Sequence, residues 1–183
     1  METYISMLRG INVGGHFKLP MPELKKLYEE LKLKNPVTYI QSGNVIFQSQ
    51  ETDLPGIADR IRQKIKKNYG YEVPVIIRTI SEMEAVIKKN PFIKMKGIDK
   101  ERLHVTFLEE IPAEEKLNKI KEPDFSPDRF INDSKEVFLH CPDGYGRSKL
   151  NNSFFESKLK VTATTRNWKT VNELYRIAAG SAE

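Results

Sequence analysis

The sequence has one cysteine, Cys141, and only three histidines among its 183 residues. A single cysteine cannot form an internal disulfide, and so few thiol and imidazole groups argue against a structural zinc site. No stretch reaches the roughly 18 apolar residues of a membrane span, and the N-terminus lacks the basic and apolar regions of a secretory signal. We therefore expect a cytoplasmic protein in a reducing compartment, with no metal site and no membrane partner.

Familiar catalytic and nucleotide-binding motifs are also missing. The sequence contains no H-E-x-x-H, G-x-S-x-G or paired-cysteine pattern, and no G-x-G-x-x-G follows a strand. Gly10 and Gly15 have the separation of the glycines in G-x-x-x-x-G-K-[ST], but His16 and Phe17 stand where that motif places its lysine and its hydroxyl. The sequence therefore predicts no cofactor, and it leaves open whether the protein is an enzyme.

The composition is that of an ordinary globular protein with a moderate excess of positive charge. Hydrophobic residues make up 39% and charged residues 30%, and 30 Lys and Arg against 25 Asp and Glu give a net charge of +5. Such an excess fits a polyanionic partner such as nucleic acid, but it is also common in proteins that bind none.

Apolar periodicity predicts alternating strands and helices in the first half of the chain. The order β-α-β-β-α-β is that of a ferredoxin-like unit, which we place at residues 1–79. A capping box at Ser81-Glu82-Met83-Glu84 predicts a linking helix that stops before Asn90, within a connecting region at 80–102. The strands are expected at 4–9, 37–41, 45–48 and 73–78, with one helix opening at Pro20-Met21 and another around Ile57, Ile61 and Ile65.

The second half, 103–183, repeats this order as β-α-β-β-α and adds a helix at its end. Its strands are expected at 103–108, 129–132 and 137–141, and its helices at 113–121, 152–159 and 167–179. The two hairpins align without a gap, pairing Tyr39 with Phe130 and Ile46 with Val137. We predict an α+β fold with two ferredoxin-like halves of the βαββα type, antiparallel sheets and extra C-terminal helices.

The most distinctive segment is the glycine-rich loop Arg9-Gly10-Ile11-Asn12-Val13-Gly14-Gly15, directly after the first strand. In a ferredoxin-like unit this loop lies at the same end of the sheet as the turn of the following hairpin. Backbone N–H groups, a guanidinium, amides and a hydroxyl together are suited to a phosphate, a carboxylate or a nucleobase edge. The candidate ligand-binding residues at this end are Arg9, Asn12, Gly14, Gly15, Gln41, Ser42 and Asn44.

A purely structural role for the same residues is an equally open alternative. Glycines provide positive φ angles, and amide side chains such as Asn12 and Asn44 commonly close turns by bonding to loop backbone. Arg9 likewise pairs either with a ligand anion or with an internal carboxylate.

A second group of basic and hydroxyl residues lies at 145–150 and 164–171. Arg166 and Asn167 complete the candidate ligand-binding residues, and Trp168 could stack on a base. The helical spacing that begins at Trp168 instead favours a buried anchor for the last helix. Cys141, at a strand end, is predicted to be a small buried hydrophobic residue and not a nucleophile.

Three strings of residues carry a family resemblance: R-G-I-N-V-G-G at 9–15, Q-S-G-N at 41–44 and R-N-W-x-T-V at 166–171. With them the chain resembles, over essentially its whole length, the bacterial domain-of-unknown-function family 1697. The resemblance implies a small cytosolic α+β protein with two ferredoxin-like halves and no assigned activity. The chain departs from the family at His16 and Glu173, which would make anion binding at the loop pH-dependent and the last helix less basic.

Together these observations predict a protein that binds a phosphate-bearing ligand, nucleic acid among them, at the end that carries the glycine-rich loop. Two other classes stay open, an enzyme acting on a small anionic metabolite and a protein-interaction module. Steep salt dependence of binding would separate the first class from the others, because each phosphate contact releases counterions.

Overall fold

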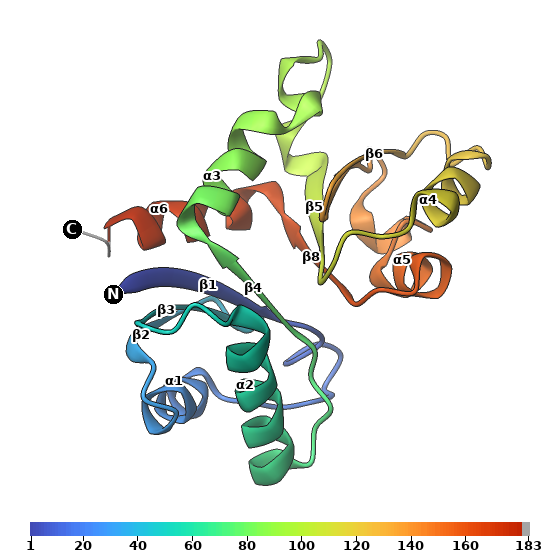
Figure 1. The fold of residues 1–183 in the computed structure, drawn as a ribbon. Helices are drawn as coiled ribbons and strands as arrows, with labels where there is room; N and C mark the ends of the chain where they lie inside the picture. The colour runs from blue at the N-terminus through green and yellow to red at the C-terminus, as the bar shows by residue number, and fades with distance from the viewer. Residues whose placement is uncertain (181–183) are drawn as a thin grey trace. The chain divides into compact units, whose positions relative to one another are not determined.

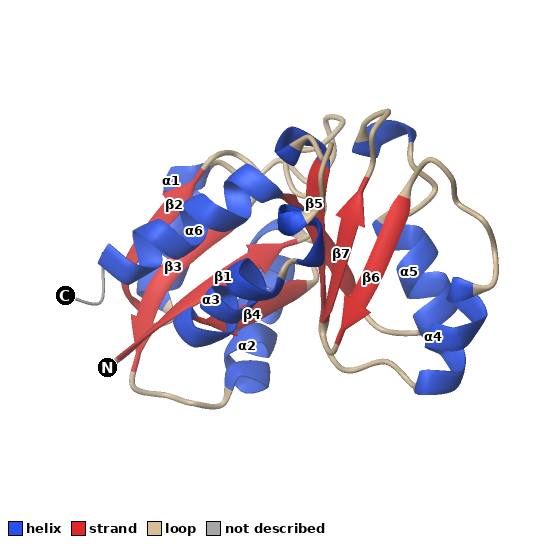
Figure 2. Ribbon diagram, turned by 90° about the horizontal axis from the view of Figure 1, so that it is seen from above, coloured by secondary structure: helices blue, strands red, loops and turns tan. Residues whose placement is uncertain are grey.

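The computed structural model describes residues 1–180 and contains two four-stranded antiparallel sheets (Figures 1 and 2). The chain divides into two compact units, one made of residues 1–84 and those from Glu173 onward, the other of residues 85–172. The last helix is shared between the two units, since its residues from Glu173 onward group with the first one. There, Tyr175 Oη donates a hydrogen bond to Glu84 Oε1 at 3.4 Å.

The first unit has the predicted ferredoxin-like order. Its sheet has the strand order β2-β3-β1-β4, with every neighbouring pair antiparallel. Helices α1 and α2 cover one face, where Tyr4 and Phe47 of the sheet pack in one core with Leu24 and Ile61 of the helices (Figure 1). The elements are β1 (Glu2–Leu8), α1 (Met21–Glu30), β2 (Lys34–Tyr39), β3 (Asn44–Ser49), α2 (Leu54–Tyr69) and β4 (Val75–Thr79).

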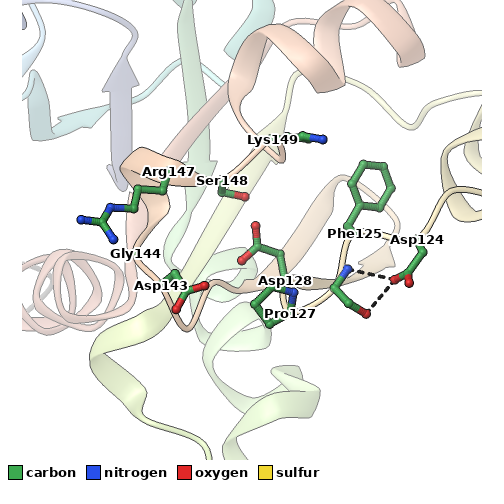
Figure 3. Close-up of a pocket in the computed structure, with 10 residues that line it drawn as sticks. Asp124, Phe125, Pro127, Asp128, Asp143, Gly144, Arg147, Ser148 and Lys149 are labelled. Atoms are coloured by element: carbon green, nitrogen blue, oxygen red, sulfur yellow. Dashed lines mark hydrogen bonds between the residues drawn. The ribbon is translucent and has the colours of Figure 1, made fainter.

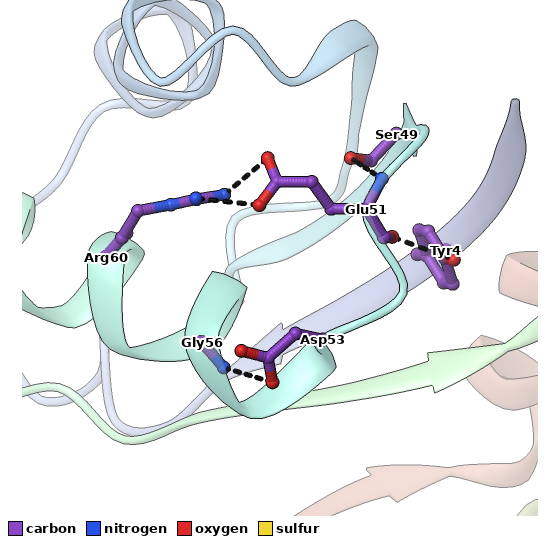
Figure 4. A network of polar contacts seen from close by, with 6 residues as sticks. All are labelled: Tyr4, Ser49, Glu51, Asp53, Gly56 and Arg60. Atoms are coloured by element: carbon purple, nitrogen blue, oxygen red, sulfur yellow. Dashed lines mark hydrogen bonds and ion pairs between the residues drawn. The ribbon is translucent and has the colours of Figure 1, made fainter.

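Helix α2 shows how local sequence sets the limits of an element. Asp53 caps its N-terminus by accepting a hydrogen bond from Gly56 N at 3.1 Å, and Gly70 ends the helix with a φ of +74°. Arg60, nearly two turns into the helix, pairs with Glu51 at 2.7 Å and so ties down the segment that leads into it (Figure 4). The predicted end near Gly70 is therefore confirmed.

The second unit repeats the same sheet, with the strand order β6-β7-β5-β8. Helices α4 and α5 share a hydrophobic core with it, in which Ile120 and Phe155 pack with Val137 and Leu139. After the linking helix α3 (Ile80–Lys89), the elements are β5 (Leu103–Leu108), α4 (Glu114–Lys121), β6 (Arg129–Asp133), β7 (Glu136–His140), α5 (Asn152–Leu159), β8 (Ala163–Asn167) and α6 (Trp168–Gly180).

Strand β8 was not predicted, and it makes the internal duplication complete. It pairs with β5 just as β4 pairs with β1, so that Arg166 opposite Val105 corresponds to Arg78 opposite Ile5. Both arginines are buried. Each strand then turns directly into a helix, and each half of the chain is a βαββαβ unit followed by a helix.

The gapless alignment of the two hairpins is wrong in both strands, by three residues in the first, where Tyr39 corresponds to Asp133 and not to Phe130, and by one residue in the second. The registers pair Ile5 with Ile46 and Val105 with Phe138, so Ile46 corresponds to Phe138 and not to Val137. The first turn spans residues 40–43, whereas the second consists of Ser134 and Lys135 alone. Because strand side chains alternate between faces, a slip of one residue exchanges the core face for the opposite face.

The capping box of α3 is also displaced from its predicted position. Thr79, not Ser81, is the capping residue: Thr79 N donates to Glu82 Oε2 at 2.8 Å, and Glu82 N donates to Thr79 Oγ1 at 3.1 Å. The predicted helix end before Asn90 is confirmed.

Cys141 is fully buried, as predicted, in the core of the second unit. Burial raises the pKa of its thiol to about 11. We expect a thiol reagent such as DTNB to label the native protein only as fast as the second unit opens, and to label one thiol per chain at once in denaturant. Rapid labelling of the native protein at neutral pH would contradict this burial.

Within residues 1–180, no helix is both long enough and apolar enough to cross a membrane.

Candidate functional site

Three connections meet at one end of the first unit: the glycine-rich loop at 9–20, the hairpin turn at 40–43 and the segment at 70–74. Leu8 N donates to Gly43 O at 2.9 Å, and Arg9 N donates to Pro74 O at 3.0 Å. The predicted contact between the glycine-rich loop and the hairpin turn is confirmed by Asn12, whose Nδ2 donates a hydrogen bond to Gln41 O. We call the exposed surface of these three connections the loop end.

Asn12 holds the glycine-rich loop together. Its Oδ1 accepts a hydrogen bond from Leu19 N at 2.8 Å, and its Nδ2 donates to Leu19 O and Gln41 O, each at 2.9 Å. Its own backbone has a φ of +56°, a region that asparagine tolerates better than most residues. The side-chain amide of Asn12 is thus used to close the loop and join it to the hairpin turn.

Gly14 and Gly15 form the tip of the loop. Their φ angles of +60° and +79° make a two-residue turn between Val13 and His16, closed by His16 N donating to Val13 O at 3.1 Å. Within residues 1–180, the N–H groups of Gly14 and Gly15 make no hydrogen bond. Both glycines are exposed, and unbonded N–H groups in such a turn are the kind of donor that binds anions.

The hairpin turn is also closed from within. Asn44 is fully buried, and its Nδ2 donates to Tyr39 O at 3.1 Å and Ser42 Oγ at 2.9 Å. The side chain of Gln41 is exposed, while its carbonyl receives the Asn12 amide. The structure therefore brings Arg9, Asn12, Gly14, Gly15, Gln41, Ser42 and Asn44 to one end of the unit, with the Asn12 and Asn44 amides engaged in the turns.

Sequence reasoning missed an aromatic cluster at the loop end. The ring of Phe17 lies 5.1 Å from that of Tyr71, and Tyr71 stacks on Tyr69 with an interplanar angle of 24°. Phe17 is 40% exposed and has a φ of +46°, an unusual backbone conformation for a bulky residue. The available signal was topological: the connection between α2 and β4 lies at the same end of a ferredoxin-like sheet as the glycine-rich loop.

Arg166 and Asn167 lie in the second unit and have structural partners there. Arg166 is buried and donates to Thr164 Oγ1 at 2.9 Å and Thr165 O at 3.0 Å, and its burial lowers the pKa of the guanidinium to about 10. Asn167 Oδ1 accepts a hydrogen bond from Thr170 N at 2.8 Å, as the N-terminal cap of α6. Trp168 is 9% exposed, as expected of an anchor.

A separate cavity of about 270 Å³ in the second unit contains part of the second basic cluster (Figure 3). Arg147 and Lys149 line it, but so do the carboxylates of Asp128 and Asp143. Asp124 in the same wall accepts hydrogen bonds from Ser126 N and Oγ. The mixture of charges gives this cavity no preference for a polyanion. Among residues 1–180, no cluster of three or more His, Cys, Asp or Glu side chains is arranged to hold a metal ion.

Comparison with known proteins gives a family and a fold. The family described as protein of unknown function (DUF1697) matches residues 1–138. The structure of the conserved bacterial protein SP0830 from Streptococcus pneumoniae is similar, with a TM-score of 0.78 and 20% sequence identity, over 97% of this chain and 98% of that one. No curated protein matches the chain. At this identity the similarity extends to the fold alone.

Proposed function

We propose that the loop end of this chain, which belongs to the DUF1697 family of proteins of unknown function, binds a single-stranded nucleic acid. The observation that carries the proposal is the exposed turn of Gly14 and Gly15, whose N–H groups make no hydrogen bond within residues 1–180, together with Phe17, 40% exposed and two residues further along the chain. Backbone donors of this kind hold phosphate oxygens, and exposed rings stack on bases of any sequence.

Charge at the loop end supports the same ligand. Lys18 follows Phe17 and is exposed, and Lys67 lies next to the loop end, in the last turn of α2. The acid within the loop end, Glu72, is paired with Lys66. The net charge of +5 adds a long-range attraction for a polyanion. In this proposal Arg9, Gln41 and Ser42 line the path of the strand, whereas Asn12 and Asn44 keep the two turns in place. The buried free thiol fits a reducing cytoplasm, where we place the protein.

Replacement of the exposed ring is the direct test. We expect Phe17→Ala to weaken binding of a short fluorescent oligonucleotide by about 5- to 150-fold, the loss of one base stack. Phe17→Leu separates stacking from apolar bulk, because leucine keeps most of the volume but has no ring, and it should lose nearly as much. Ile111→Ala, which removes an even more exposed apolar side chain from the second unit, is the control and should bind normally.

Salt and ligand length distinguish this proposal from a small-metabolite site. Affinity measured by fluorescence anisotropy should fall steeply with salt and should rise as the oligonucleotide is lengthened. Equal affinity for a mononucleotide and an oligonucleotide, with little effect of salt, would contradict the proposal and favour an enzyme that acts on a small anion. If the protein binds neither a mononucleotide nor an oligonucleotide, the proposal is wrong and the loop end is left as a contact surface for a protein partner.

A further inference from the structure

Strand β6 is an edge of the second sheet, with β7 as its one strand neighbour within residues 1–180 (Figure 2). On the side of β7 that faces β5, Leu108 N donates to Lys135 O and Cys141 N donates to Arg102 O, so the odd-numbered residues along β7 direct their backbone groups toward β5. In an antiparallel sheet the backbone groups of successive residues alternate between the two neighbouring strands, and the even-numbered residues of β7, which are Glu136, Phe138 and His140, therefore direct theirs toward β6. Their register partners are the odd-numbered residues of β6, so the N–H and C=O groups of Phe130 and Asn132 point outward from the sheet.

The sequence of this edge is complementary to itself. Arg129, Ile131 and Asp133 lie on one face of the strand and are all exposed, Ile131 by 39%. In an antiparallel pair of two β6 strands centred on Ile131, Arg129 faces Asp133 of the second copy. The same register lets Phe130 and Asn132 exchange hydrogen bonds with Asn132 and Phe130 of that copy, and it places the two Ile131 side chains in a close, non-hydrogen-bonded pair.

The corresponding edge of the first sheet is blocked. Strand β2 has a shift in register between Lys34 and Val37, with Pro36 inside the shift and a φ of +49° at Asn35. Proline and bulges are the usual devices that prevent strands from pairing edge to edge. Val37 occupies the position in β2 that Ile131 occupies in β6, since they pair with Ile46 and Phe138, and its exposure of 42% is similar.

We propose that two copies of this chain associate through antiparallel pairing of their β6 strands, which joins their second sheets into one. An apolar cleft of about 260 Å³ that includes Phe92, Met95 and Ile131 lies along the same strand and enlarges the contact. The existing ion pair of Asp133 with Lys89, at 3.5 Å, is solvent-exposed on both sides and is easily exchanged for Arg129 of the second copy. A short strand buries little area, so the dimer is a weak one that forms at high protein concentration.

Charge reversal tests the register. Sedimentation equilibrium of the full chain over a wide concentration range should show a monomer–dimer equilibrium. Arg129→Asp and Asp133→Arg each place like charges opposite each other and should each weaken dimerisation at least tenfold. The double variant restores opposite charges and should regain most of the affinity of the natural chain. A chain that stays monomeric up to millimolar concentration, or a dimer that survives both single reversals, would overturn the proposal.

Cysteine cross-linking tests the two-fold axis. Ile131→Cys places two thiols in a directly opposed pair and should give a covalent dimer on mild oxidation, while the buried Cys141 does not react. Val37→Cys is the matched control, equally exposed on the blocked edge, and should stay monomeric. A natural chain that dimerises while Ile131→Cys fails to cross-link, or equal cross-linking of both variants, would also overturn the proposal.

Discussion

Gly43→Ala is expected to lower the free energy of unfolding by about 2 to 5 kcal/mol. Gly43 has a φ of +75°, and a Cβ added there would lie 2.6 Å from Ile11 Cδ1 and 2.9 Å from Leu8 Cβ. The left-handed conformation costs an alanine about 1 to 2 kcal/mol, and the overpacking adds about 1 to 3 kcal/mol. Leu8 belongs to a paired strand and cannot move away cheaply.

Gly15→Ala is the control that separates these two costs. Gly15 has nearly the same φ, +79°, but nothing lies within 4 Å of its added Cβ. It should lose only the conformational part, about 1 to 2 kcal/mol. Urea unfolding monitored by circular dichroism measures both variants. Equal losses would mean that Ile11 and Leu8 accommodate the methyl group and that the hairpin turn is loosely packed.

The loop end shows which parts of a site can be predicted from the sequence. Topology sufficed to bring the glycine-rich loop and the hairpin turn together, because a ferredoxin-like order fixes which connections share an end of the sheet. It could not tell that the Asn12 amide would be used up by Leu19 and Gln41, since that depends on distances between loops. The same limit hid the contact of Phe17 with Tyr71, which joins two loops far apart in the sequence.

The missed strand β8 has a different cause. Its sequence Ala163-Thr164-Thr165-Arg166-Asn167 has few apolar residues and no hydrophobic alternation, so the pattern of a half-buried strand is absent. The buried polar groups satisfy one another: Thr165 Oγ1 lies 2.8 Å from Thr106 Oγ1, and Arg166 bonds to Thr164. Such pairing is visible only once β5 and β8 are neighbours. The position of Arg166 opposite β5, equivalent to that of Arg78 opposite β1, favours a role in the fold for a residue that sequence alone assigned to ligand binding.

Trp168→Ala is expected to cost about 3 to 5 kcal/mol of stability, the range for truncation of a large buried aromatic side chain. Trp168 is the first residue of α6, is 9% exposed, and begins a buried stripe that continues through Val171, Leu174 and Ala178. Lys169→Ala, one position further along the same turn and exposed, is the control and should change stability by less than about 0.5 kcal/mol. Chemical unfolding measures the loss, and oligonucleotide binding by the fraction that stays folded separates the two roles of the ring. Unchanged stability together with lost binding would make Trp168 a contact residue, whereas the expected result, lower stability with normal binding, leaves the loop end as the binding surface.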